Sequence, residues 1–191
     1  MKTGLFFGSF NPIHIGHLAI ANYMLEFSDL DEIWFVVSPQ NPLKNKKTLL
    51  NEYDRFKMVE LALDNNPKIK PVDIEFRLPK PSYTIDTLTY LSEKNPKHDF
   101  VLIAGTDNFQ SFHKWKNYEE ILNQYMLYIY PRPNYEIGEY ENHKSIKQIN
   151  APLMEISSSF IRNAIKEEKD IRYFLPAKVY DYIQQMHFYK K

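Results

Sequence analysis

The chain of 191 residues contains no cysteine. This absence excludes disulfide bonds, thiolate catalysis and zinc sites built from cysteine ligands. It is compatible with a reducing compartment. Internal repeats and low-complexity tracts are also absent from the sequence, so the repeat architectures are excluded as well.

The chain also lacks a net charge, because 24 Lys and Arg residues balance 24 Asp and Glu residues. Proteins held on nucleic acid by bulk charge usually have a basic excess, so we expect no nucleic-acid partner, although a local basic cleft stays open. No apolar run approaches the ~18 residues that a membrane span needs. The apolar run at residues 5–7 is too short for the core of a signal peptide. We therefore expect a cytoplasmic protein with no membrane partner.

What the sequence does contain is enough apolar surface for a packed core, since 43% of the residues are hydrophobic and 15% aromatic. Apolar runs alternate with amphipathic stretches, which predicts an α/β fold with a mainly parallel sheet and helices on both faces. We expect strands at 4–7, 33–37, 69–74, 100–104, 125–130 and 153–156, and helices at 17–27, after Asn51, and at 83–94, 160–166 and 176–186. The polar stretch 134–150 is predicted to be an exposed excursion. We expect one domain over 1–191, with a small C-terminal helical part from about 157.

The loop after the first predicted strand carries the strongest functional signal. Residues 8–17 read Gly-Ser-Phe-Asn-Pro-Ile-His-Ile-Gly-His, between a strand and a helix. Ligands of open α/β sheets lie at the carboxyl ends of the strands, where the helix N-terminus offers free N–H groups. Gly8 and Gly16 allow a close approach of the backbone. His14 and His17 would provide two donors suited to a polyphosphate and to the charge that grows on it during transfer.

His14-Ile15-Gly16-His17, with the preceding Gly-Ser-Phe-Asn-Pro, resembles the HxGH signature of the nucleotidyltransferase superfamily. Within that superfamily the chain looks like the bacterial nicotinate-nucleotide adenylyltransferase family over nearly its whole length. The resemblance implies a Rossmann-like nucleotidyltransferase fold. It also implies that His14 and His17 bind the ATP phosphates and stabilise the transition state.

The resemblance implies further binding roles in the same loop. Gly8, Ser9, Phe10 and Gly16 would bind ATP. Asn11 would lie on the side of the pyridine nucleotide, where many bacterial relatives have Asp. The exchange keeps a hydrogen-bonding side chain but removes a charge, so this loop does not decide between an acid and an amide acceptor.

Two downstream segments resemble the family's other ATP-binding motifs. Residues 156–162, Ile-Ser-Ser-Ser-Phe-Ile-Arg, read locally as a capped helix start with an arginine. They resemble the ISSTxIR motif, which implies phosphate contacts from Ile156, Ser157, Ser158, Ser159 and Arg162, with Ser159 in place of the usual threonine. Gly105 and Asp107, after the strand at 100–104, resemble a GxD motif, which implies contact with the adenosine moiety.

The pyridine nucleotide is expected to bind at four further residues. Residues 82–88, Ser-Tyr-Thr-Ile-Asp-Thr-Leu, resemble the SYTxDTL segment of the nicotinate pocket, which points to Thr84. Trp115 stands where the family has an aromatic residue near the ring, although Lys116 departs from the aromatic residue often found there. Lys44, in a basic loop, and Arg132, in an Arg-Pro element, are further candidates for phosphate contact.

The activity that this resemblance implies is adenylyl transfer from ATP to nicotinate mononucleotide, giving nicotinate adenine dinucleotide (deamido-NAD) and pyrophosphate in NAD biosynthesis. Mg²⁺ would bridge ATP oxygens as the cofactor. The motifs contain no carboxylate cluster, so we expect no metal site made of protein ligands. The motifs also contain no obvious nucleophile, which agrees with direct in-line attack.

Several alternatives stay open. Nicotinamide mononucleotide or phosphopantetheine could be the acceptor, although the segment at 82–88 and Trp115 speak against phosphopantetheine. The serine motif differs from that of the cytidylyltransferases. A non-catalytic nucleotide-binding module is disfavoured by the intact His14, His17 and Arg162. The length and neutral charge disfavour a fragment of a class I aminoacyl-tRNA synthetase. The oligomeric state is undecided, with a homo-oligomer among the options.

Overall fold

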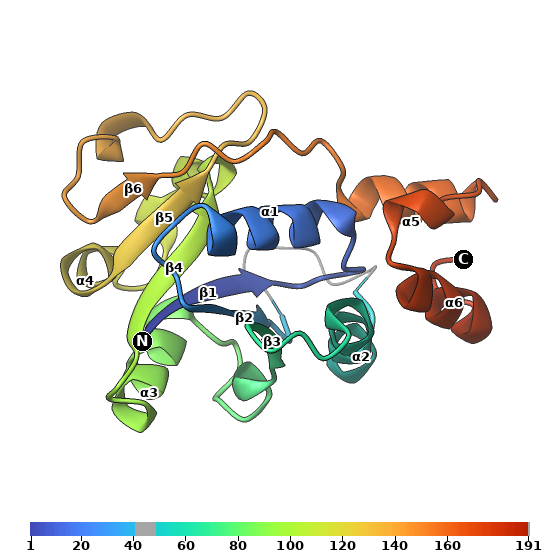
Figure 1. Ribbon diagram of the computed structural model, residues 1–191, viewed down its shortest axis with the longest axis horizontal. Coiled ribbons are helices and arrows are strands. Elements are labelled where there is room, and N and C mark those ends of the chain that lie inside the picture. The colour runs from blue at the N-terminus through green and yellow to red at the C-terminus, as the bar shows by residue number, and fades with distance from the viewer. Residues whose placement is uncertain (41–48, 191) are drawn as a thin grey trace.

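The computed structural model of the chain describes residues 1–40 and 49–190. Its centre is a twisted sheet in the order β3-β2-β1-β4-β5-β6, and every strand pair in these residues is parallel (Figure 1). The strands are β1 Lys2–Gly8, β2 Glu32–Val37, β3 Ile69–Val72, β4 Asp99–Gly105, β5 Met126–Tyr130 and β6 Ile146–Gln148. This order is that of a doubly wound Rossmann-like sheet, in which the strand order reverses between β1 and β4.

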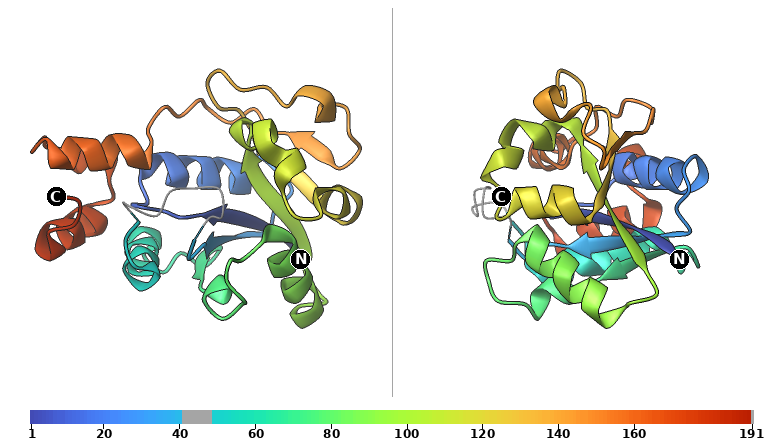
Figure 2. Two further views of the ribbon diagram at one scale, coloured as in Figure 1. Left: turned by 180° about the vertical axis from the view of Figure 1, so that it is seen from behind. Right: turned by 90° about the vertical axis from the view of Figure 1, so that its left-hand side faces the viewer.

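Helices cover both faces of the sheet, as the alternating pattern predicts (Figures 1 and 2). The α-helices are α1 Ile15–Glu26, α2 Glu52–Leu63, α3 Thr84–Lys94, α4 Tyr118–Gln124, α5 Ser158–Lys166 and α6 Ala177–Met186. Apolar residues of α1, α2, α5 and α6 share one core with the sheet, and those of α3 and α4 form a second core on its other face. Neighbouring residues of one strand serve opposite cores, since Leu5 belongs to the second and Phe6 to the first.

The edge of the sheet beyond β5 differs from the prediction. Residues 153–156 form no strand, whereas β6, Ile146–Gln148, lies within the stretch 134–150 that was expected to be an exposed excursion. An edge strand with Lys147 and Gln148 exposed has no continuous apolar run, so its sequence gives no strand signal. The strand predicted at 69–74 is shorter, because β3 ends at Val72 and Ile74–Phe76 form a 3₁₀ turn.

The C-terminal helices extend the first core beyond the carboxyl ends of the strands (Figure 1). Ile161 of α5 and Val179 and Ile183 of α6 are fully buried in it. The Tyr182 hydroxyl donates to Asp54 on α2 at 3.1 Å, and Lys178 forms an ion pair with Asp64. Among the helices in the described residues, none is long and apolar enough to cross a membrane.

Candidate active site at the carboxyl ends of the strands

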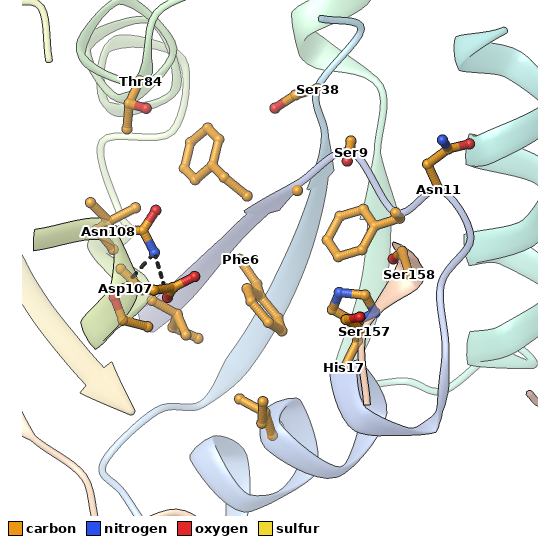
Figure 3. A pocket seen from close by; sticks show the side chains of 18 of the residues that line it. Phe6, Ser9, Asn11, His17, Ser38, Thr84, Asp107, Asn108, Ser157 and Ser158 are labelled. Atoms are coloured by element: carbon orange, nitrogen blue, oxygen red, sulfur yellow. Dashed lines mark hydrogen bonds between the residues drawn. The ribbon is translucent and has the colours of Figure 1, made fainter. Parts of the chain in front are cut away.

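A cavity of about 450 Å³ opens at the carboxyl ends of the strands, within the size range of small-molecule sites. It lies at the topological switch point, between the loops that follow β1 and β4, where doubly wound folds bind their ligands. Figure 3 shows His17, Ser157 and Ser158 on one side of the pocket and Asp107 and Asn108 on the other. The starts of α1, α3 and α5 contribute residues to its wall.

The cavity brings together nearly all of the residues predicted from the sequence. Those that line it are Gly8, Ser9, Phe10, Asn11, His14, Gly16, His17, Thr84, Gly105, Asp107, Trp115, Arg132, Ser157, Ser158, Ser159 and Arg162. Ile156 does not line it but lies behind Gly16, since a Cβ atom at Gly16 would be 3.7 Å from the Cβ of Ile156. Lys44 lies outside the described residues.

The two histidines lie against each other at the start of α1. His14 is the N-cap residue of the helix, and its ring centroid is 3.8 Å from that of His17. The backbone N–H of His14 donates to Nδ1 of His17 at 3.3 Å. A neutral His17 whose Nδ1 accepts this bond carries its proton on Nε2, which makes Nε2 a donor. The rings of Phe6 and Phe10 contact the His17 ring at centroid distances of 6.1 and 5.1 Å and hold its plane.

His14 is kept neutral by its surroundings. Its side chain is buried, with 4% of its surface exposed, and this burial, with the nearby Arg132 guanidinium, lowers its pKa from 6.5 to about 4. Within the described part of the chain its Nδ1 has no hydrogen-bond partner. A buried polar atom without a partner is costly and is typical of a site that receives a ligand.

The two glycines of the first loop make room for aromatic rings. A Cβ atom at Gly16 would lie 3.0 Å from Nδ1 of His14, which is too close for any other residue without displacing the ring. A Cβ atom at Gly8 would lie 2.7 Å from the Phe10 ring. Glycine at these positions therefore allows the histidine pair and its aromatic support to pack against the backbone.

The serine-rich segment is fastened to the first loop by side-chain hydrogen bonds. Ser157 is the N-cap of α5 and accepts from the backbone N–H of Phe160 at 3.1 Å, so the simple capping role also holds. The Ser158 hydroxyl donates to the carbonyl of Pro12 at 2.8 Å. The Arg162 guanidinium donates to the carbonyl of Asn11 at 2.8 Å and to the Ser159 hydroxyl at 3.2 Å. The start of α5 and the histidine loop thus form one wall.

The opposite wall follows β4 and β5. Asp107 accepts from the Asn108 amide at 3.4 Å and lies 4.0 Å from Nε of Arg132. The Arg132 guanidinium also donates to the carbonyl of Met154 at 3.0 Å. The Arg132 charge also contributes to lowering the pKa of His14, after the larger effect of burial. This wall combines a carboxylate and an amide with one guanidinium.

The start of α3 forms a third part of the cavity. Its N-cap residue, Tyr83, makes no capping bond through its side chain, and Ser82, Tyr83 and Thr84 line the cavity. Lys116 donates to both carboxylate oxygens of Asp86 at 2.9 Å and lies 4.9 Å from the Tyr83 ring centroid. A helix N-terminus whose N-cap side chain makes no capping bond favours an anionic ligand group, while the Lys116 charge is already balanced by Asp86.

Comparison with known proteins shows the family of the chain. The family model described as cytidylyltransferase-like matches residues 5–164. A relative from Cytophaga hutchinsonii, named "Probable nicotinate-nucleotide adenylyltransferase", is 57% identical over 189 residues, which are 99% of this chain and 98% of the relative. A relative of the same name from Flavobacterium psychrophilum is 55% identical over 193 residues, with 100% of both chains covered. The chain belongs to the nicotinate-nucleotide adenylyltransferase family.

Solved structures with this fold include a Plasmodium falciparum nicotinic acid mononucleotide adenylyltransferase complexed with NaAD. It has a TM-score of 0.83 at 23% identity, with 99% of this chain and 97% of that chain covered. The same Plasmodium protein complexed with APC has a TM-score of 0.82 at 22% identity, with 99% and 97% covered. At this identity the likeness concerns the fold, and it confirms the Rossmann-like nucleotidyltransferase architecture.

Sequence reasoning missed two buried side chains that organise the site of this family member. Arg55 of α2 is fully buried, and its guanidinium donates to the carbonyls of Leu50, Ser9, Ser38 and Pro39 at 2.9, 2.6, 2.7 and 2.8 Å. Burial lowers its pKa to about 10, which still leaves it charged at neutral pH. The one available signal was its position on the face of α2 that also presents Met58 and Val59.

The second missed side chain is Glu75, which follows β3 and lines the cavity with 2% of its surface exposed. It stands in a short turn, and neither motif nor periodicity singles it out. In the described parts of this adenylyltransferase family member, no group of three or more His, Cys, Asp or Glu side chains could hold a metal ion.

Proposed function

We propose that the chain transfers the adenylyl group of ATP to nicotinate mononucleotide, releasing pyrophosphate and forming nicotinate adenine dinucleotide in NAD biosynthesis. The observation that carries this function is the convergence of the histidine pair, Arg162 and the start of α3 on one cavity. The histidine side offers donors for a polyphosphate, and the α3 side offers an anion-binding helix end. The names of the relatives support the same acceptor.

The reaction we propose is a direct in-line displacement. A phosphate oxygen of the acceptor attacks the α-phosphorus of ATP, the bond to the oxygen that bridges to the β-phosphorus breaks, and pyrophosphate leaves with the electron pair. Such chemistry depends on positioning and on stabilisation of the developing charge, so no protein nucleophile is required. The family resemblance assigns the ATP side to the loop at 8–17, Gly105, Asp107 and the segment 156–162.

His17 and His14 have different parts in this mechanism. His17 would donate from Nε2, because its Nδ1 accepts the backbone N–H of His14. His14 is neutral above a pH of about 4 and would donate to a phosphate oxygen from the ring nitrogen that carries its one proton. Arg162 and Arg132 would add positive charge near the leaving pyrophosphate.

Mg²⁺ would enter with ATP. Since the described residues offer no cluster of metal ligands, the ion would be held mainly by phosphate oxygens and water. When bound, it would neutralise charge on the phosphate chain. The cavity residues would orient the loaded nucleotide and add hydrogen bonds and charge at the phosphates.

The acid form of the acceptor fits the start of α3 better than the amide. A ring carboxylate would meet the helix N-terminus of α3 at Thr84. A neutral amide gains less from this helix end. Trp115 lines the same cavity and would stack against the pyridine ring.

The Asn11 side chain accepts from the Tyr189 hydroxyl at 2.8 Å and from the Leu50 N–H at 3.3 Å, so we assign it to holding this region together around the acceptor.

We propose that residues 1–191 act as one nucleotidyltransferase domain, in the cytoplasm, with ATP and nicotinate mononucleotide as partners and neither nucleic acid nor membrane. α5 and α6 share the core of the sheet, which supports a single unit. The sequence lacks cysteine, and no helix in the described ranges could span a membrane. Both observations support a cytoplasmic location.

The deciding experiment is a side-by-side assay of pyrophosphate release. The purified chain is incubated with ATP and Mg²⁺ and with nicotinate mononucleotide, nicotinamide mononucleotide or phosphopantetheine, and the dinucleotide is identified by mass. We expect the highest kcat/KM with nicotinate mononucleotide. A higher kcat/KM with either other acceptor would overturn the assignment of substrate, and no release with any of them would overturn the enzymatic function.

A further inference from the structure

Glu75 is a buried carboxylate on the cavity wall that the reaction itself does not use. Its Oε2 accepts from the Ser82 hydroxyl and its Oε1 from the Thr87 hydroxyl, each at 2.9 Å. The Ser38 hydroxyl is a third donor. In the described ranges, no Lys, Arg or His forms an ion pair with it. Burial raises its pKa, and the three hydroxyls oppose that rise.

The free-energy cost of burying the Glu75 carboxylate without a cation indicates its role. A carboxylate buried without a cation is destabilising unless its oxygens are fully hydrogen-bonded, and here both oxygens are used by hydroxyls. A direct contact between Glu75 and an anionic acceptor would be repulsive. Its contribution to the site must therefore pass through the groups that it holds.

The groups held by Glu75 enclose the start of α3. Ser82 and Thr87 lie on either side of the N-cap residue Tyr83 in sequence, and Thr87 also donates to the Tyr83 carbonyl at 3.4 Å. The side chain of the N-cap residue Tyr83 makes no capping bond, so Glu75 supports the first turn of the helix from outside, through the Ser82 and Thr87 hydroxyls. Ser38 adds a link to the first loop, because its backbone N–H donates to the Gly8 carbonyl at 2.9 Å.

We propose that Glu75 is a positioning residue that fixes the first turn of α3 for recognition of the acceptor's ring carboxylate. The inference rests on the proposed function, since it concerns the same acceptor site. It assigns Glu75 to acceptor binding and selectivity, and it leaves ATP binding to the loop at 8–17, Gly105, Asp107 and the segment 156–162.

The first test replaces Glu75→Gln, which keeps the size of the side chain but offers one acceptor oxygen in place of two. We expect the KM for nicotinate mononucleotide to rise about tenfold, as for the loss of one hydrogen bond to a charged group. The KM for ATP should stay within about twofold. The preference for the acid over the amide mononucleotide, as a ratio of kcat/KM values, should fall about tenfold by the same reasoning.

The second test is a mutant cycle that separates positioning from direct contact. Ser82→Ala with Thr87→Val should reproduce the effect of Glu75→Gln, and adding Glu75→Gln to that pair should change the acceptor KM by less than about twofold. Thr89→Val, at an exposed position of the same helix, is the matched control. Thermal unfolding of each variant monitors the fold. If Glu75→Gln does not fold, the acceptor KM of the single variant Thr87→Val provides the test instead.

The outcomes separate the inference from the function on which it rests. If the unmodified chain does not use nicotinate mononucleotide, the proposed function fails. If it does, an unchanged acceptor KM in Glu75→Gln overturns the inference, and so does an equal rise in the KM of both substrates. A full effect of Glu75→Gln in the Ser82→Ala, Thr87→Val background would show that Glu75 acts on the acceptor directly and would overturn it too.

Discussion

At the scale of single residues, His17 is the side chain whose removal should affect chemistry more than binding. Its Nδ1 accepts the backbone N–H of His14, which leaves Nε2 as the donor of the neutral ring. The rings of Phe6 and Phe10 hold the imidazole in place. Loss of one pre-oriented donor to developing charge lowers turnover by about 10²- to 10³-fold. We expect His17→Ala to lower kcat by about that factor and to raise the KM for ATP less than about threefold. Steady-state kinetics with varied ATP measure both.

The matching control is Phe27→Ala, which removes an exposed ring at the other end of the same helix and should leave both constants near their original values. A large rise in KM for ATP with turnover intact in His17→Ala would assign His17 to ground-state binding instead.

His14 should make the stability of the fold depend on pH. Its pKa is about 4 in the folded chain, against 6.5 when exposed, so the unfolded chain binds more protons between these values. The free energy of unfolding must then fall as pH is lowered through this window, by about 2 kcal/mol between pH 7 and pH 5, and it is fully retained above pH 6.5. Urea unfolding at pH 7 and pH 5 measures the loss, and His14→Gln should abolish this part of it. Equal pH dependence in both proteins would contradict the neutral, buried histidine.

The sequence predicts functional residues well where a motif combines several residues with a strand end or helix start. His14, His17 and Arg162 lie 148 residues apart at the extremes, yet all three line one cavity. Arg55 and Glu75 escape prediction because their roles depend on burial and on carbonyls or hydroxyls from distant segments. A single charged residue without a partner in the sequence is most often a solvated surface group, and only the fold shows otherwise.

At the scale of elements, α2 holds two loops of the site through one guanidinium. Replacement of Arg55→Met would keep much of the side-chain volume but leave four carbonyls without their donor. Each unsatisfied buried carbonyl costs about 1–3 kcal/mol, although some of them would regain water. We expect a loss of at least ~3 kcal/mol in the free energy of unfolding, measured by urea denaturation.

Lys57→Met is the control on the same helix, because the Lys57 side chain is about half exposed and pairs only with the exposed Glu60 within the described residues. It should change the stability by less than about 0.5 kcal/mol. A similarly small change in Arg55→Met would mean that the loops at Ser9 and Ser38 do not depend on the guanidinium.

Buried elements with long apolar patterns were predicted from the sequence more accurately than short or exposed ones. Strands β1, β2, β4 and β5 and helices α1 and α3 have long apolar patterns and lie close to the expected bounds. The edge strand β6 has exposed polar residues, and α4 is short, so neither gives a periodic signal. Residues 153–156 include three apolar side chains but do not pair in the sheet, and Ile156 instead packs behind Gly16 and against the first core.

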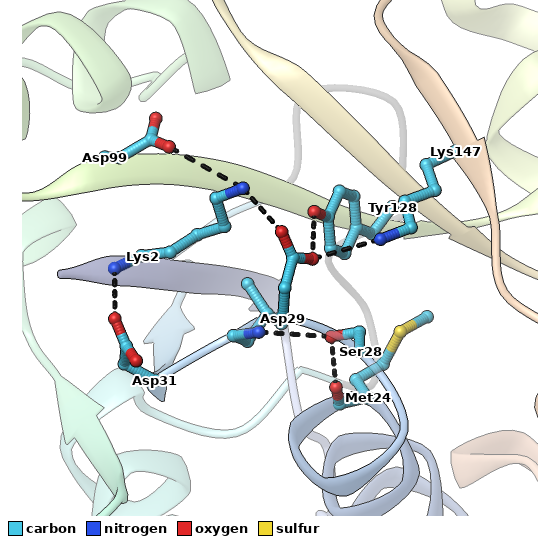
Figure 4. A network of polar contacts seen from close by, with 9 residues as sticks. Lys2, Met24, Ser28, Asp29, Asp31, Asp99, Tyr128 and Lys147 are labelled. Atoms are coloured by element: carbon cyan, nitrogen blue, oxygen red, sulfur yellow. Dashed lines mark hydrogen bonds and ion pairs between the residues drawn. The ribbon is translucent and has the colours of Figure 1, made fainter.

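At the scale of the whole molecule, the two ends of the sheet have separate tasks. The carboxyl ends hold the cavity, whereas Asp29, beside the start of β1, holds a polar network that joins distant parts of the chain (Figure 4). Asp29 accepts from Lys2 at 2.6 Å, from the Tyr128 hydroxyl at 2.5 Å and from Lys147 at 3.0 Å. It thereby connects the segment before β2 with β1, β5 and β6, and it should affect stability without affecting catalysis.

The size and pH dependence of this contribution follow from its exposure and its charges. The hydrogen bond from Lys2 holds the pKa of Asp29 well below its usual value. The stabilisation is therefore present above pH 3.8 and is lost as pH falls further towards the lower folded value. Because the Asp29 side chain is 51% exposed, screening by solvent limits the three contacts to about 1 kcal/mol in total. We expect Asp29→Asn to lower the free energy of unfolding by that amount at pH 7.

Two further measurements decide whether the network acts as described. In 1 M salt the difference between Asp29→Asn and the unmodified chain should shrink, since the Debye length falls to about 3 Å. The kcat and both KM values should stay unchanged, because the network lies away from the cavity-lining residues. A stability difference that persists in high salt would assign the effect to the hydrogen bond from the uncharged Tyr128 hydroxyl, and a change in kcat would show that the two ends of the sheet are coupled.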